Sequence, residues 1–161
     1  RLESAPGEGS AFSFAVPLTL GREEDAGTET EELTFSGRRI LVVEDNELNA
    51  EIAQCLLEER DFTVECVYDG SQAVERIRST PPGTYDVILM DIMMPVMDGL
   101  DATRAIRAMD REDCKTIPII AMSANAFDDD LKKSVACGMN GHLSKPVEVE
   151  KLYQVLHQVL Q

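Results

Sequence analysis

At residues 86–95 the chain reads Asp-Val-Ile-Leu-Met-Asp-Ile-Met-Met-Pro. Four consecutive apolar residues without alternation are typical of a short strand that is covered on both faces of a sheet. Such strands belong to parallel sheets, which bind ligands beyond the carboxyl ends of their strands. We therefore expect Asp91, the acid that directly follows the apolar run, to lie at a functional edge of a buried parallel sheet.

Outward from this strand, residues 37–161 repeat one unit five times: an apolar run, a turn and an apolar stripe at helical spacing. The expected strands are Arg38–Glu44, Phe62–Tyr68, Tyr85–Met90, Thr116–Met122 and Gly141–Ser144. The expected helices begin near Asn46, Ser71, Asp98, Asp128 and Glu148. Because crossovers between parallel strands are right-handed, the helices must cover both faces of the sheet. The pattern predicts an α/β fold, a doubly wound parallel sheet of five strands with five helices.

The first 36 residues differ in composition from the rest of the chain. Residues 11–16 alternate apolar and small side chains, which predicts one amphipathic strand without a partner strand. Residues 21–36 carry six acids against Arg22 and hold too little apolar area to fold, so we interpret them as a flexible acidic linker. The globular domain therefore spans residues 37–161.

The charge balance excludes some classes of partner. The chain has 15 Lys and Arg against 30 Asp and Glu, a formal net charge of −15, which disfavours binding to nucleic acid or to an anionic membrane surface. No apolar run approaches the roughly 18 residues that cross a bilayer. The four cysteines form no Cys-x-x-Cys pair, so we expect reduced thiols and a cytoplasmic location. Since the chain begins at Arg1, we expect it to be part of a longer protein, whose other parts can anchor it to a membrane.

Three acids at strand ends indicate a metal site. Glu44 and Asp45 end the first expected strand of the domain, and Asp91 follows the third. These strands should be neighbours at the centre of the sheet, so three carboxylates there would need a compensating cation. Oxygen ligands without His or Cys favour Mg²⁺ or Mn²⁺ over Zn²⁺, and we expect Mg²⁺. Each acid alone could be a solvated turn residue or a helix cap, and only the combination points to a metal.

Asp91 is also suited to act as a nucleophile. Carboxylates form aspartyl-phosphates, a reaction that needs little beyond in-line positioning and neutralisation of charge. Lys145 and Ser123, at the ends of the last two expected strands, could offer an ammonium and a hydroxyl to the phosphoryl oxygens. Either residue alone would more often be a surface lysine or a strand-end hydroxyl.

Residues 37–161 closely resemble the receiver domain of two-component response regulators. The resemblance rests on four motifs in the family's order and approximate spacing: Ile40–Asn46, Met90–Gly99, Met122–Ala126 and Ser144–Pro146. It implies a flavodoxin-like sheet with the strand order 2-1-3-4-5. It also implies, in many members, a cis peptide bond between Lys145 and Pro146, the one bond type in which the cis form costs little.

The same resemblance implies roles for the site residues. Asp91 would accept a phosphoryl group from a histidine of a kinase or of a phosphotransfer domain. The implied ligands of Mg²⁺ are Glu44, Asp45, Asp91 and the carbonyl of Met93. Ser123 and Lys145 would bind the phosphoryl group.

A shorter resemblance concerns the leader. Residues 7–18 look like the glycine-rich segment and last strand of a histidine-kinase ATP-binding domain, although a hairpin arm would look the same. Residues 1–20 would then be a remnant of that domain, joined by the linker of residues 21–36 to the receiver, as in hybrid sensor kinases. The fragment itself would lack the kinase catalytic domain and would act as a phosphoacceptor that catalyses its own phosphotransfer and dephosphorylation.

Two positions depart from the common pattern of the family. His142 stands where many receivers carry a Tyr or Phe that changes rotamer when the hydroxyl at the Ser123 position moves toward the phosphoryl group. Imidazole is smaller and titrates near neutral pH, so we expect either a different, pH-dependent switch or a half-exposed edge residue without a switching role. Met93 is apolar and would orient an attacking water poorly, so we expect slow autodephosphorylation.

Taken together, the residues and the two resemblances imply the receiver domain of a hybrid sensor histidine kinase, with phosphorylation at Asp91. The main alternative is a receiver-like docking module that is never phosphorylated. A flavodoxin that binds a flavin is disfavoured, because Glu44 and Asp45 would repel the flavin phosphate. A hydrolase of the haloacid dehalogenase type would need an Asp in place of Met93. The oligomeric state is left open.

Overall fold

The computed structural model describes residues 2–5, 9–12, 34–124 and 128–161, and the chain divides into two units, residues 1–31 and 32–161. In the first unit, β1 (Leu2–Ala5) and β2 (Gly9–Phe12) pair as an antiparallel hairpin. The expectation of one strand without a partner is therefore wrong. The partner strand is four residues of mixed polarity, too short for an alternating pattern to show. Residues 13–16 of the expected strand, and the expected linker up to residue 33, lie outside the described residues. The expected linker end at residue 36 is wrong, because Phe35 is buried in the core of the second unit and its ring stacks on Phe62 with 4.5 Å between centroids.

Five parallel strands form the centre of the second unit. They are β3 (Arg39–Val43), β4 (Thr63–Val67), β5 (Val87–Asp91), β6 (Ile119–Ser123) and β7 (Gly141–Ser144). Hydrogen bonds order them β4-β3-β5-β6-β7, and every neighbouring pair is parallel. Counted along this unit, the strand order is 2-1-3-4-5, so the flavodoxin-like topology is confirmed.

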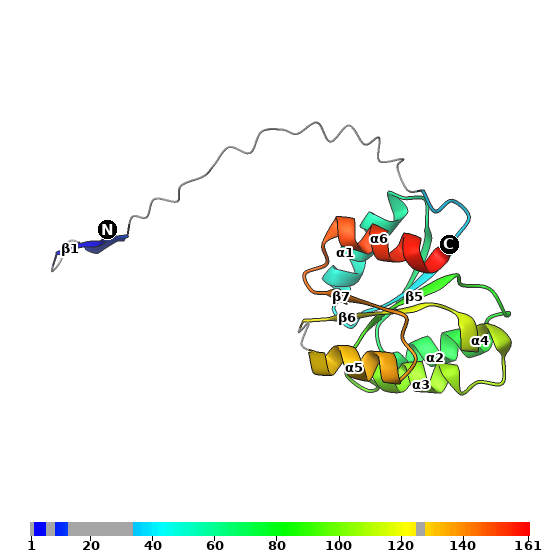
Figure 1. Cartoon of the computed structure of the whole chain (residues 1–161). Helices are drawn as coiled ribbons and strands as arrows, with labels where there is room; N and C mark the ends of the chain where they lie inside the picture. Colours follow the sequence, from blue (N-terminus) through cyan, green and yellow to red (C-terminus); the bar gives the residue numbers. More distant parts are fainter. Residues whose placement is uncertain (1, 6–8, 13–33, 125–127) are drawn as a thin grey trace. The chain divides into compact units, whose positions relative to one another are not determined.

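In the described part of this unit, six helices cover the two faces of the sheet. They are α1 (Glu47–Glu58), α2 (Gly70–Ser79), α3 (Gly99–Arg107), α4 (Glu112–Thr116), α5 (Asp128–Ala136) and α6 (Val149–Leu160). Helices α1 and α6 lie on one face and α2 to α5 on the other (Figure 1). Alternate residues of a strand serve the two sides: Ile40 and Val42 belong to the hydrophobic layer under α1 and α6, Leu41 and Val43 to the other layer. Because both faces are covered, all residues of β5 and β6 are buried.

The five predicted helices all begin within one residue of the predicted positions. The side chains of Asn46, Asp69 and Asp98 each accept a hydrogen bond from a backbone N–H in the first turn of α1, α2 and α3. Such caps satisfy N–H groups that the helix itself leaves unpaired. Past the end of α5, Gly138 has a φ of +97°, the left-handed conformation in which helices commonly end.

The expected number of five helices is wrong by one short helix. Helix α4 has only five residues, too few for an apolar stripe to appear in the sequence. It also takes up Thr116, where the fourth strand was expected to begin, and β6 begins only at Ile119. The residue before β6 is Pro118, which has no N–H to donate to a ladder.

Candidate functional site

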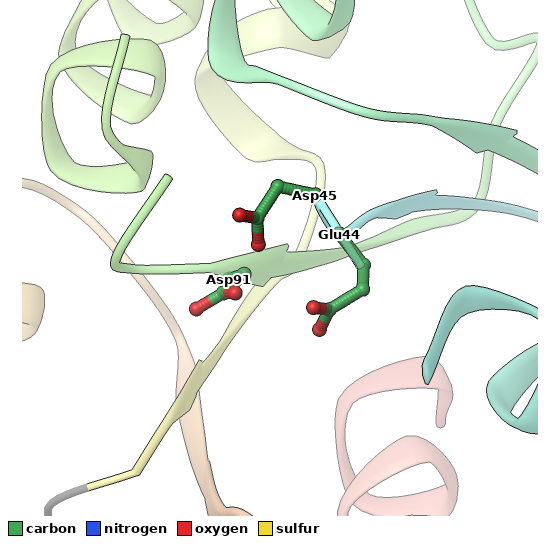
Figure 2. A group of neighbouring side chains, drawn as sticks. All are labelled: Glu44, Asp45 and Asp91. Atoms are coloured by element: carbon green, nitrogen blue, oxygen red, sulfur yellow. The ribbon is translucent and has the colours of Figure 1, made fainter. Parts of the chain in front are cut away.

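Three carboxylates meet at the carboxyl edge of the sheet. Asp91 is the last residue of β5, one residue beyond the strand end expected from the sequence, and Glu44 and Asp45 directly follow β3, its neighbour. One oxygen of each acid lies within 4.8 Å of those of the other two. Glu44 and Asp91 are buried, whereas Asp45 is exposed. Figure 2 shows the three side chains extending from the ends of the two strands into one region.

Lys145 joins this cluster from the end of β7. Its Nζ donates hydrogen bonds to Oδ2 of Asp91 at 2.7 Å and to Oε2 of Glu44 at 2.5 Å. The peptide bond to Pro146 is cis, as expected, and the backbone N–H of Lys145 donates to the carbonyl of Ser123 at 2.8 Å. Burial alone would lower the pKa of Lys145, but the hydrogen bonds to Asp91 and Glu44 outweigh it and raise the pKa. The ammonium is therefore charged at neutral pH and offsets two buried negative charges.

The buried carboxylate of Asp91 accepts hydrogen bonds from two donors. Besides Lys145, the backbone N–H of Met93 donates to Oδ1 at 3.1 Å. Burial raises the pKa of Asp91, and the hydrogen bond from Lys145 opposes this shift. The side chain of Met93 is 77% exposed, so it extends from the loop after β5 into solvent. Asp91 thus has a fixed orientation and a partner for each of its oxygens.

Two asparagines that our sequence analysis did not assign to the site hold Glu44. The backbone N–H of Asn46 lies 3.3 Å from Oε1 of Glu44, and Nδ2 of Asn49 lies 3.4 Å from the same oxygen. Asn46 was expected only as the start of a helix. Its second role follows from its position two residues after Glu44, whereas the contact of Asn49 requires the first turn of α1 to be folded.

Gly99 allows the chain to pass close behind Asp91. Its N–H donates to the carbonyl of Ile92 at 3.0 Å, at the start of α3. A Cβ atom at this position would overlap the carbonyl oxygen of Asp91. The residue must therefore be glycine for the loop after β5 to return to the sheet.

Ser123 and His142 form a second contact at the same edge. Ser123 ends β6 and is 2% exposed, and its Oγ lies 3.0 Å from Nε2 of His142 on β7. His142 is half-buried. The structure therefore brings together the two residues that the sequence singled out as a possible switch, in direct hydrogen-bond contact.

The donor set fits a hard divalent cation. Within the described ranges, Glu44, Asp45 and Asp91 are the one group of three acidic, His or Cys side chains close enough to share an ion. All three offer oxygen atoms, the ligands that Mg²⁺ and Mn²⁺ prefer, and three protein ligands leave positions for water or a phosphoryl oxygen. The four cysteines are free thiols and do not contribute to this group. Burial raises the pKa of the Cys114 and Cys137 thiols, which makes them poor metal ligands.

Comparison with known proteins agrees with this geometry. Residues 40–157 match the response regulator receiver domain family. Histidine kinase 5 of Arabidopsis thaliana is 33% identical over 97% of this chain, and hybrid signal transduction histidine kinase I of Dictyostelium discoideum is 36% identical over 81% of it. The chain spans 19% and 8% of the lengths of these two relatives, so it corresponds to a small part of each.

Solved structures show the same fold. The receiver domain of a sensor histidine kinase from Pseudomonas aeruginosa superposes with a TM-score of 0.69 at 39% identity, covering 78% of this chain and 98% of that one. That crystal structure holds a magnesium ion coordinated in the active-site cleft. A chemotaxis response regulator of Vibrio cholerae reaches a TM-score of 0.70 at 28% identity, covering 76% of this chain and 98% of its own. None of the helices in the described part of our chain is long and apolar enough to cross a membrane.

Proposed function

This chain belongs to the response regulator receiver domain family, and we propose that Asp91 is its phosphoacceptor. Receiver domains act in two-component signalling, and the relatives named above are histidine kinases, of which the Dictyostelium discoideum protein is a hybrid kinase. One observation carries the assignment of Asp91. It is the acid of the cluster that ends a central strand, is buried, and contacts the ammonium of Lys145 at 2.7 Å.

The side chains around Asp91 suit transfer of a phosphoryl group. An oxygen of the Asp91 carboxylate attacks phosphorus as the P–N bond of a phosphohistidine breaks, and the leaving nitrogen keeps the electron pair of that bond. If the other ring nitrogen already carries a proton, the histidine leaves neutral; otherwise it takes one proton from solvent. Lys145 offers its ammonium to one phosphoryl oxygen, and the hydroxyl of Ser123 can donate to another. Bound Mg²⁺, held by Glu44, Asp45, Asp91 and the carbonyl of Met93, would neutralise negative charge on the phosphoryl group.

We infer that the phosphodonor is the histidine of a kinase or of a phosphotransfer domain, within the same parent protein or on a separate one. Identities of 33% and 36% to two histidine kinases, one of them hybrid, support a hybrid sensor kinase as the parent. Residues 1–20 fit a remnant of its ATP-binding domain, and the acidic segment from residue 21 fits a linker that ends before Phe35, because Phe35 is buried in the core of the receiver. The four free thiols are those expected in a reducing cytoplasm, where we place this domain.

Intact mass spectrometry tests the proposal directly. The purified chain is incubated with acetyl phosphate and Mg²⁺, and we expect one phosphoryl adduct per chain. The adduct should be absent with EDTA and absent in Asp91→Asn. Asp110→Asn is the matched control, because it makes the same chemical change at an exposed carboxylate past the end of α3 and should leave the adduct intact.

The outcome separates this function from its main alternative. A wild-type chain that forms no adduct under any of these conditions, while remaining folded, would support a docking module that is never phosphorylated. An adduct that survives in Asp91→Asn would place the acceptor elsewhere.

A further inference from the structure

The carboxylate of Glu44 has hydrogen-bond donors on both of its oxygens. Oε2 accepts from the ammonium of Lys145 at 2.5 Å. Oε1 lies 3.3 Å from the backbone nitrogen of Asn46 and 3.4 Å from Nδ2 of Asn49. An ionised carboxylate has no proton to donate, so the amide of Asn49 must present its NH₂ group to Glu44 rather than its oxygen. Asn49 is therefore a hydrogen-bond donor to a candidate ligand of the metal.

Asn49 is the one of these three donors that can be removed without disturbing the others. Lys145 also contacts Asp91, and the donor of Asn46 is a backbone group that no side-chain substitution removes. The backbone N–H of Asn49 donates to the capping oxygen of Asn46 at the start of α1, and this bond does not depend on the side chain at position 49. A substitution of Asn49 therefore tests the side-chain contact with Glu44 alone.

Glu44 depends on these hydrogen bonds because it has space in which to move. Its side chain is one methylene longer than that of an aspartate, and the extra rotatable bond gives the carboxylate more orientations. A cavity of about 160 Å³ lies beside it, lined by Glu44, Asn49 and Lys145 and by apolar side chains from α1, from β6 and from the segment after β7. Packing therefore does not hold the carboxylate on the side of the cavity, and the donors do.

The number of donors on Glu44 limits how it can bind a cation. A carboxylate accepts about four hydrogen bonds or metal contacts, about two on each oxygen. With Asn46 and Asn49 at Oε1 and Lys145 at Oε2, the free position is on Oε2, so Glu44 can offer a cation one oxygen and not both. Mg²⁺ requires near-octahedral single contacts at about 2.1 Å, whereas Ca²⁺ accepts a carboxylate through both oxygens at about 2.3–2.6 Å. The arrangement therefore suits Mg²⁺ better than Ca²⁺.

We propose that Asn49 is a positioning residue that determines the cation specificity of the site: its amide occupies Oε1 of Glu44, so that Glu44 binds a cation through one oxygen only and the site prefers Mg²⁺ to Ca²⁺. The inference rests on the proposed binding of Mg²⁺ by Glu44, Asp45 and Asp91. Asn49 acts through Glu44 and is not itself a ligand. Hydrogen bonds of this kind commonly orient the side chains that bind metals.

Cation titrations of the whole chain, without a phosphodonor, test this inference. ¹H–¹⁵N NMR spectra recorded through additions of Mg²⁺ or of Ca²⁺ give the two dissociation constants. Asn49→Leu keeps nearly the same shape and removes the donor. We expect it to weaken binding of Mg²⁺ about tenfold, the lower end of the usual effect of removing a hydrogen bond to a metal ligand. Binding of Ca²⁺ should change less than about threefold, because Ca²⁺ can use the second oxygen that the substitution frees.

Gln54→Leu is the matched control. Gln54 lies on the same helix, and its amide donates to Oε1 of Glu58 at 2.7 Å, a carboxylate outside the acidic cluster. This variant should leave both dissociation constants unchanged. In a Glu44→Gln background, where Asp45 and Asp91 still bind the cation weakly, Asn49→Leu should have no further effect, since the residue through which it acts is gone. Urea unfolding in EDTA shows whether each variant is folded.

The outcomes separate this inference from the proposed function. The role of Asn49 is wrong if Asn49→Leu leaves the Mg²⁺ dissociation constant unchanged, if it weakens Mg²⁺ and Ca²⁺ equally, or if its effect persists in the Glu44→Gln background. None of these results bears on phosphorylation of Asp91, which the mass of the adduct tests separately. A wild-type chain that binds neither cation overturns this inference together with the metal site.

Discussion

The Nζ atom of Lys145 lies 2.7 Å from Oδ2 of Asp91, although 54 residues separate them in the chain. The same ammonium contacts Glu44 on the other side. One cation therefore bridges two buried acids that stand at the ends of adjacent strands. The carboxylates repel each other, so the charge of Lys145 is part of what keeps this edge of the sheet folded before any metal or phosphoryl group arrives.

Replacing this cation should destabilise the fold. Lys145→Met leaves two buried carboxylates without a counter-charge, and we expect the free energy of unfolding in EDTA to fall by about 3 kcal/mol. Added Mg²⁺ should restore more stability to this variant than to the wild type. Urea unfolding with and without Mg²⁺ measures both effects.

Lys151→Met is the matched control for this experiment. Lys151 pairs with Glu148 at 2.8 Å, but both side chains are more than half exposed. Loss of an exposed ion pair should cost less than about 1 kcal/mol, with no dependence on Mg²⁺. Equal losses of unfolding free energy in the two variants would show that burial does not strengthen the contribution of the Lys145 ion pairs to stability.

The pKa values of two aspartates should be shifted in opposite directions from the ordinary value. Burial raises the pKa of Asp91, and the hydrogen bond from Arg111 lowers the pKa of Asp113. In metal-free protein, carboxyl ¹³C NMR should therefore place Asp91 above and Asp113 below the ordinary value of about 3.9. Titration of both at the same pH would contradict the assigned causes.

These shifts have opposite consequences for stability. The ionised form of Asp113 stabilises the fold above the unfolded-state pKa, and this contribution is lost as the pH falls through its lowered folded pKa. Asp91 binds its proton more tightly when folded, so acidification through its raised pKa favours the folded state. The same protonation removes the nucleophile, and phosphorylation should therefore fail in acid before the fold does.

Gly99→Ala should be strongly destabilising. The added Cβ would overlap the carbonyl oxygen of Asp91, and we expect a loss of about 3 kcal/mol in urea unfolding. Gly83→Ala provides the comparison. Gly83 has a φ of +74° with open space around it, so alanine there should cost only about 1 kcal/mol of backbone strain. A smaller loss at Gly99 than at Gly83 would mean that the loop after β5 can move away.

The phosphorylated form should be long-lived because Met93 cannot orient water. We expect Met93→Gln, which offers polar atoms at this exposed position, to shorten the half-life of phospho-Asp91 about tenfold. Val96→Gln introduces the same side chain at another exposed position of the loop and should change little. Intact mass against time after removal of the phosphodonor gives the half-lives. A wild-type half-life of seconds in Mg²⁺ would contradict the prediction.

The sheet and its acidic edge could be predicted because they depend on local patterns. Buried parallel strands are apolar runs, and the residue that ends each run lies at one edge whatever the details of packing. That is why Glu44, Asp45, Asp91 and Lys145 could be placed together from the sequence, and the structure brings them within hydrogen-bond or ligand distance.

Features that depend on rotamers or on very short elements could not be predicted. Helix α4 has five residues and no periodicity, and β1 has four. The contact of Asn49 with Glu44 depends on how far α1 turns before the amide reaches the carboxylate. The hydrogen-bond contact of His142 with Ser123 was foreseen only as a shared role, because it depends on the rotamers of both side chains.

The acids of the site stand at the ends of strands whose other residues form the two hydrophobic layers of the domain. Unfolding of these strands therefore also separates the acids of the site, so thermodynamic linkage makes a bound ion stabilise the fold. At a hundredfold excess over its Kd, a ligand adds about 2.7 kcal/mol to the free energy of unfolding. Melting temperatures across a series of divalent cations thus form an affinity scale for this site, which is valuable in a chain without tryptophan to report binding by fluorescence.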